Sequence, residues 1–176
     1  MNPAAQLTQQ LFLGKAVREN HALEHATITL LSNKYPDIRL AGVSIAKGFF
    51  IFGDVPTDII LPTAEEALER LRKNEPELAI HERCGTNLAV AGFVTAGAAT
   101  FVARMRKPFG TFSNAVIAAT VALYFSRPLG MLMQKLVTTH TPHPAMKLVS
   151  AKRFMWLGGP AHFVSTDNPE VSGLFS

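Results

Sequence analysis

The chain is 176 residues long, which is enough for one compact domain with a buried core and too short for two large independent domains. Hydrophobic residues make up 48% of it and charged residues only 17%, whereas roughly 25% of residues are charged in an average soluble protein. Lys and Arg number 17 against 13 acids, a net charge of +4, but they form no stripe interleaved with aromatic residues. This composition argues against nucleic acid as a partner and favours contact with lipid, in particular an anionic membrane surface.

The single cysteine, Cys84, excludes an intrachain disulfide and is typical of a reducing compartment or of a metal site. The first residues, Met-Asn-Pro-Ala-Ala-Gln, do not combine a basic stretch with an apolar one, so no secretory signal peptide is expected. We therefore expect the N-terminal part of the protein to lie in the cytosol.

Residues 15–33 are predicted to form a helix. One side of it is apolar and carries Leu23, Ala26, Thr27, Leu30 and Leu31. His21, Glu24 and His25 fall on the opposite side in the order H-x-x-E-H, and positions i, i+3 and i+4 of a helix share a narrow arc of its surface. A solvent-exposed polar face has the same pattern, but Ile28 on this side indicates that the face is covered.

Two extended runs follow, residues 40–46 and 49–55, with Lys47-Gly48 between them. Glycine at that point favours a tight turn, so a β-hairpin is expected. The segment 63–73 is then predicted to form an amphipathic helix that ends before Pro76, with Thr63 as its N-cap and Glu66 at the capping-box position. Residues 15–80 are thus expected to form a small unit of helix, hairpin and helix.

The runs 85–103 and 108–126 carry no charged residue, and each is close to the roughly 20 residues that a helix needs to cross a bilayer. Small residues in the first run would let two such helices approach closely: Gly92, Ala96, Gly97 and Thr100. We expect an integral membrane hairpin with both termini in the cytosol, because more basic residues flank its outer ends than its short loop. Two buried helices of a soluble core are the alternative.

The tail from residue 141 onward is punctuated by proline and glycine, and it is expected to be irregular. The sequence therefore predicts a predominantly helical α+β protein in three parts: a metal-binding unit over 1–86, a two-helix membrane hairpin over 87–139, and an irregular tail over 140–176.

Two histidines on one helix offer a metal two ligands, and His81 and Cys84 offer two more in the spacing H-x-x-C. Imidazole and thiolate suit zinc, which takes three or four protein ligands. If His21, His25, His81 and Cys84 all bind, the site is closed and structural, and Glu24 orients a histidine. If only three bind, water takes the fourth position and Glu24 can be its general base.

Other polar residues are weaker candidates for this site. H-x-x-E-H resembles the inverted zinc motif of one group of metallopeptidases, which take a downstream glutamate as third ligand; here Glu75, Glu77 and Glu82 are available and none is singled out. His140, His143 and His162 are left outside the site. Surface histidines and a buried apolar cysteine remain the alternative without a metal.

Three segments together resemble a known family: Glu19-Asn-His-Ala-Leu-Glu-His-Ala-Thr-Ile, His81-Glu-Arg-Cys-Gly-Thr-Asn-Leu and Leu132-Met-Gln-Lys-Leu-Val-Thr-Thr139. They resemble a family of bacterial membrane proteins of unknown function found in cyanobacteria and related phyla and, more distantly, the YqhQ-like membrane proteins. The resemblance implies no reaction, but it implies one shared site next to a membrane, formed by His21, Glu24, His25, His81, Arg83, Cys84, Gly85 and Thr86.

The first functional hypothesis is a membrane-anchored zinc-dependent hydrolase of the peptidase type, with Glu24 as catalytic base and Zn²⁺ on His21, His25, His81 and Cys84. The second is a non-catalytic membrane protein whose metal is structural or regulatory. The third is a metal-free soluble domain. The partner expected in the first two is the lipid bilayer, and a homo-oligomer is compatible with both.

Overall fold

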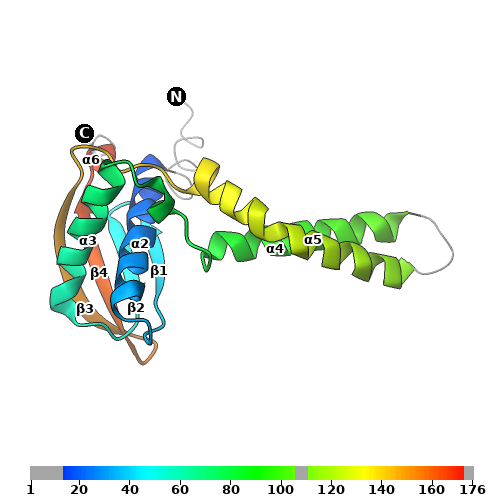
Figure 1. The fold of residues 1–176 in the computed structure, drawn as a ribbon, viewed down its shortest axis with the longest axis horizontal. Coiled ribbons are helices and arrows are strands. Elements are labelled where there is room, and N and C mark those ends of the chain that lie inside the picture. Colours follow the sequence, from blue (N-terminus) through cyan, green and yellow to red (C-terminus); the bar gives the residue numbers. More distant parts are fainter. Residues whose placement is uncertain (1–13, 106–110, 173–176) are drawn as a thin grey trace. The chain divides into compact units, whose positions relative to one another are not determined.

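The computed structural model of the protein describes residues 14–105 and 111–172 (Figure 1). The chain divides into two compact units, one made of residues up to His81 and from Val137 onward, the other of Glu82–Leu136. The chain thus leaves the first unit once and returns to it once. The predicted fold class, mixed α+β with a helix, a β-hairpin and helices before two long apolar helices, is confirmed.

The first unit is a four-stranded antiparallel sheet with two helices on one of its faces (Figure 1). The strands run in the order β1-β2-β4-β3. In chain order the elements are α2 (Lys15–Lys34), β1 (Ala41–Ile45), β2 (Gly48–Phe52), α3 (Thr57–Arg72), the 3-10 helix η1 (Pro76–Ala79), β3 (Lys147–Trp156), β4 (Gly159–Asp167) and the short α6 (Pro169–Ser172).

The expectation of an irregular tail is wrong, because β3 and β4 supply half of the sheet. The two strands form a hairpin of their own, and β4 then pairs along β2 with Phe50 opposite Phe163. Of the four prolines in this tail, two lie before β3, one lies near the start of β4 and one begins α6. Gly158 lies in the tight turn between the two strands. A β-hairpin, and not a free tail, therefore completes the first unit.

The core of the first unit lies between the sheet and the helices. Alternate residues of the inner strands point into it, among them Phe49, Ile51 and Val164, all fully buried. They pack against apolar residues of both helices, including Leu23 and Ile60. Most of α2 is buried, including the side that carries Glu24 and His25, so this helix has no simple solvent-exposed polar face.

The helix predicted over 63–73 begins six residues earlier than expected. Its first residue is Thr57, so Thr63 is a buried interior residue and not the N-cap. The turn before Pro62 is helical because it buries Ile60 in the core, and a proline removes only one hydrogen bond near the start of a helix. Thr63 instead receives a weak hydrogen bond of 3.4 Å from the Lys34 ammonium group.

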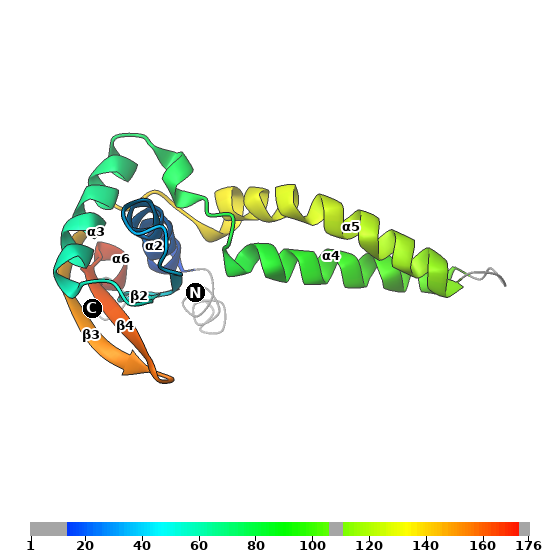
Figure 2. The same cartoon turned by 60° about the horizontal axis from the view of Figure 1, so that its bottom comes forward.

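The second unit is an antiparallel pair of helices (Figure 2). α4 spans Gly85–Arg104, and α5 spans Thr111–Met133 and continues into a π-helical turn, η2 (Gln134–Thr138). Two stretches, Gly85–Arg104 and Phe112–Thr138, are long and apolar enough to cross a membrane. The predicted start of the second apolar run, with the basic loop before it, lies outside the described residues.

The helices of the second unit do not approach each other through the small residues that the sequence suggested. Gly92 and Gly97 have open space where a Cβ would stand. The close approach is at Gly130, where a Cβ would meet the side chain of Asn87 and lie 2.9 Å from its Cα. Asn87 also accepts a hydrogen bond of 2.7 Å from Gln134, which is fully buried. Packing is therefore tightest at the end where α4 begins.

Candidate metal site

His21 and His25 lie one turn apart on α2, and their rings are in contact. The ring centroids are 4.2 Å apart, and one nitrogen of each ring lies within 4.8 Å of the other. His25 is buried, and His21 is partly exposed. A tetrahedral zinc ion holds its ligands about 2.0 to 2.1 Å away, so two imidazoles this close need only small side-chain rotations to share one ion.

A backbone carbonyl fixes the orientation of each of these two rings. The Nδ1 atom of His25 lies 2.7 Å from the carbonyl oxygen of Ala79, and that of His21 lies 2.9 Å from the carbonyl oxygen of Thr138. Because a carbonyl only accepts hydrogen bonds, both Nδ1 atoms carry the proton and donate. In a neutral imidazole that donates from Nδ1, Nε2 is the nitrogen that has a lone pair. This is the arrangement of a metal-binding histidine, whose other ring nitrogen is held by the surrounding protein.

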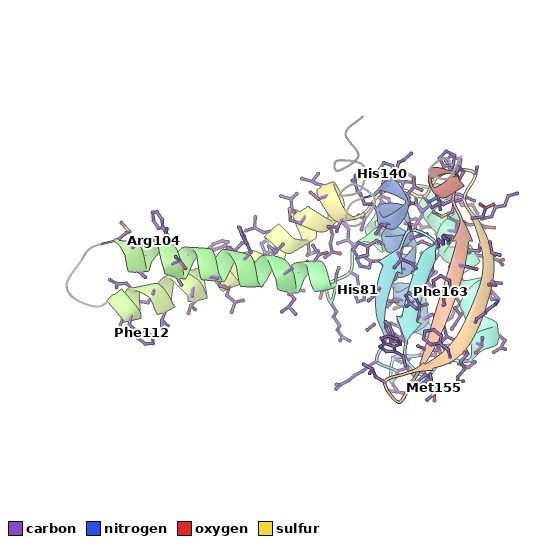
Figure 3. All side chains as sticks on the ribbon, turned by 180° about the vertical axis from the view of Figure 1, so that it is seen from behind. His81, Arg104, Phe112, His140, Met155 and Phe163 are labelled. Atoms are coloured by element: carbon purple, nitrogen blue, oxygen red, sulfur yellow. The ribbon has the colours of Figure 1, made fainter. Side chains whose placement is uncertain are left out.

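His81 adds a third imidazole to the group. Its ring centroid is 5.8 Å from that of His25. It follows η1 directly, at the point where the chain leaves the first unit (Figure 3). The first unit thus places the rings of three predicted metal ligands near one another, but the ligand atoms of the three do not all lie within 4.8 Å of one another, as those of His21 and His25 do.

Glu24 points towards strand β1. Its carboxylate accepts a hydrogen bond of 2.5 Å from the Ser44 hydroxyl, and a Cβ at Gly42 would collide with it. Burial raises the pKa of Glu24 above its ordinary value of 4.5, while the Ser44 hydrogen bond and the charge of His21 act to lower it. Glu24 is therefore a buried carboxyl group beside His21, held in place by the sheet.

Cys84 belongs to the second unit, where it caps the N-terminus of α4. Its sulfur accepts a hydrogen bond of 3.4 Å from the backbone N–H of Thr86, and the thiol is not in a disulfide. The positive end of a helix stabilises a thiolate, the form of cysteine that binds metals.

The other candidates from the sequence have structural partners. Glu75 forms an ion pair of 2.6 Å with Arg70, which lowers the pKa of Glu75, and Glu82 pairs with Arg127 at the same distance. The ring of His143 accepts a hydrogen bond from the backbone of Ala145. His140 lies 3.8 Å from the carboxylate of Glu19, and His162 is buried in the sheet.

Four groups that hold the site in place could not be identified from the sequence pattern. The carbonyls of Ala79 and Thr138 orient the histidines, and backbone groups leave no trace in side-chain patterns. Ser44 and Gly42 contact Glu24 from β1, and only the alternation along that strand could have suggested that they face the helix.

Comparison with known proteins places the chain in a family without an assigned activity. Residues 16–151 match the family described as a domain of unknown function, DUF6391. An uncharacterised protein of Picosynechococcus sp. (strain ATCC 27264 / PCC 7002 / PR-6) is 34% identical over 159 residues, which cover 84% of this chain and 78% of that protein. No solved structure matches. The expected bacterial family of unknown function is thereby confirmed, and the likeness to YqhQ-like proteins stays a prediction. The chain belongs to the DUF6391 family.

Proposed function

We propose that this protein is a membrane-anchored metalloprotein with a structural zinc ion. The ion is bound by His21, His25, His81 and Cys84, and it links the first unit to the start of the membrane hairpin. The observation that carries the proposal is the pair of carbonyl hydrogen bonds to His21 and His25. Both rings are held through Nδ1, as in metal-binding histidines, and both acceptors lie next to the points where the chain leaves and re-enters the first unit.

Cys84 fits the fourth position because of where it stands in the chain. It follows His81 by three residues, and three residues span about 11 Å at most. Two ligands separated by such a short link are a common way for a protein to hold zinc. Three imidazoles and one thiolate would complete a tetrahedral site, which is the closed arrangement of structural zinc. Other transition metals accept the same donors, and zinc is proposed because nitrogen and sulfur ligands together suit it.

Metal content tests this proposal. Elemental mass spectrometry of protein purified in detergent without chelators should give about one zinc per chain. His25→Ala and Cys84→Ser should each lose most of it. His140→Ala, which removes an exposed histidine outside the site, is the matched control and should keep it. Full zinc in Cys84→Ser would overturn the assignment of the thiol, and no zinc in the wild type would overturn the site.

Hydrolysis is the second candidate function, and Glu24 is the observation that favours it. Burial beside His21 raises the pKa of its carboxyl group, which is how proteins adapt a glutamate to general acid–base work. When bound with an open coordination position, zinc activates a water molecule for attack on an amide or ester. Glu24 would accept a proton at its carboxylate oxygen, while Ser44 holds that group in place.

Glu24→Gln separates the two functions. A hydrolase would keep its zinc in this variant and lose roughly 10²- to 10⁴-fold in turnover of a fluorogenic peptide panel. A structural site would keep its zinc while the wild type shows no turnover on the same panel. Loss of zinc in Glu24→Gln would contradict the role of Glu24 as a base.

The membrane attachment is part of the same proposal. α4 has 20 residues, which at 1.5 Å per residue gives about 30 Å, the thickness of the hydrocarbon core. Arg104 ends α4, and the Glu82–Arg127 pair lies where charged groups would meet the opposite membrane surface. We propose that both helices cross the bilayer and that the first unit lies in the cytosol, with both termini on that side.

A further inference from the structure

The β3–β4 hairpin ends in three consecutive exposed apolar residues. Met155, Trp156 and Leu157 are 64%, 56% and 94% exposed. They project past the end of β2, because the pairing between β2 and β4 stops at Phe52 and Ala161 (Figure 2). Single exposed apolar residues are common in folded proteins, but a run of three on one projecting turn is not explained by packing within the chain.

The turn itself is unfavourable for leucine. Trp156 pairs with Gly159, so Leu157 and Gly158 form a two-residue loop, and both have positive φ, +48° and +81°. That is the type I′ geometry, in which asparagine followed by glycine is preferred. A leucine is unfavourable in the left-handed conformation, because its Cβ comes too close to the following carbonyl oxygen. Leu157 therefore lowers the stability of the hairpin, and its exposed side chain does not pack in the core. A residue of this kind is expected to contact something other than the rest of the protein.

The surface next to this tip is also apolar. Phe50, Phe154 and Phe163 lie on the sheet face opposite to α2 and α3, and the ring of Phe50 is 4.7 Å from Phe163 and 5.9 Å from Phe154 (Figure 3). The exposed base Lys152 is on the same face as these rings. The tip is thus the projecting end of an aromatic surface with a positive charge on it.

We propose that the tip Met155–Trp156–Leu157 inserts into the interfacial layer of a lipid bilayer that carries anionic headgroups. Tryptophan is favoured at that depth because its ring is apolar while its N–H remains polar, and basic residues nearby attract anionic lipid. Trp156 is paired with Gly159, so only the backbone groups of Leu157 and Gly158 lie outside the strand ladder. In the interfacial layer those groups can hydrogen-bond to water and lipid headgroups, which the hydrocarbon core would not allow.

A lipid surface fits this tip better than a protein partner does. A standard protein interface covers about 800 Å² on each side, and three side chains on a narrow turn supply only a fraction of that. A bilayer needs no matching pocket. The chain also carries two helices able to cross a membrane, so a lipid surface is within reach of the protein. This inference is independent of the metal site.

Trp156 is the only tryptophan of the chain, so its fluorescence reports on the tip alone. The experiment uses full-length protein reconstituted into phosphatidylcholine–phosphatidylglycerol vesicles, with and without dibrominated phosphatidylcholine, and measures only protein that floats with the vesicles. Insertion predicts that brominated lipid reduces the emission at least about twofold and that acrylamide quenches it weakly, as expected for an interfacial tryptophan.

Leu157→Asn is the informative variant because the proposal gives it two opposite effects. It should raise the melting temperature, since asparagine suits the turn, and it should weaken quenching by brominated lipid. Trp156 that is open to acrylamide and insensitive to brominated lipid would overturn the proposal. Protection from both quenchers would overturn it too, since it would mean that a protein surface covers the tip. Failure of the protein to float would have the same consequence.

Discussion

The histidines of the first unit differ in what their two ring nitrogens contact. His21 and His25 each donate from Nδ1 to a carbonyl, as metal-binding histidines do. His162 is fully buried on β4 and contacts the Thr57 hydroxyl through Nε2 at 3.1 Å, while its Nδ1 has no hydrogen-bond partner among the described residues. Burial lowers the pKa of His162 below its ordinary value of 6.5, and the charge of Arg153 lowers it further. His162 therefore folds as a neutral residue.

The neutral state of His162 predicts an acid-sensitive fold. The unfolded chain binds a proton near pH 6.5 and the folded chain only at lower pH, so the stability that neutral His162 supports is present above pH 6.5 and lost as the pH falls below it. His162→Gln does not titrate and can keep the contact with Thr57. In chelator-treated protein, the melting temperature of the variant should fall less than that of the wild type between pH 7.5 and 5. An equal fall in melting temperature for the wild type and His162→Gln over this pH range would contradict the contribution of neutral His162 to stability.

Some residues of the site were predictable and others were not. Helical spacing was enough to bring His21 and His25 together, because positions one turn apart always share a face. His81 was a candidate because of its residue type. Its position near His25 depends on the tertiary fold, which the sequence pattern around His81 does not predict. The contact between Ser44 and Glu24 depends on which face of β1 meets the helix, and that is fixed only when the sheet packs.

One close contact between α4 and α5 combines a glycine with a pair of polar side chains. Gly130 leaves room for Asn87, and Gln134 on the next turn hydrogen-bonds to the same side chain. A hydrogen bond between side chains in an apolar medium is worth more than steric fit alone, because leaving either group without a partner is costly. The sequence suggested small residues in α4 as the contact, but the glycine that matters is on α5.

Substitution of Gly130 tests this packing. Gly130→Ala places a Cβ against Asn87, and overpacking of this kind costs about 1–3 kcal/mol. Gly97→Ala is the matched control, because its Cβ meets open space and alanine favours a helix. Unfolding by sodium dodecyl sulfate in mixed micelles should give a lower free energy of unfolding for Gly130→Ala than for the wild type, and no decrease for Gly97→Ala. Equal behaviour of the two would show that α5 does not press on Asn87.

At the scale of elements, the sequence predicted the first helix, the first hairpin and both apolar helices, because their periodicity or length is strong. Strands β3 and β4 were not predicted from the sequence, although alternating residues flank Gly158-Gly159. The prolines and glycines of this segment were interpreted as signs of irregular structure. The predicted start of α3 was also too late, since Thr63 resembled a cap and Pro62 resembled a boundary.

At the scale of the whole molecule, the first unit is interrupted in the sequence by the two apolar helices and completed by the strands that follow them. Both chain crossings lie beside a histidine hydrogen bond, at Ala79 and at Thr138. A metal bound there would connect α2 to the chain on its way into α4.

Cobalt substitution tests most directly whether the two motifs form one metal site. Co²⁺ bound by three imidazoles and one thiolate in a tetrahedron gives intense visible bands and a thiolate-to-cobalt charge-transfer band. We expect both in the wild type, loss of the charge-transfer band in Cys84→Ser, and loss of binding in His25→Ala. A weak octahedral spectrum without a thiolate band, unchanged in Cys84→Ser, would contradict the claim that His21, His25, His81 and Cys84 hold one ion.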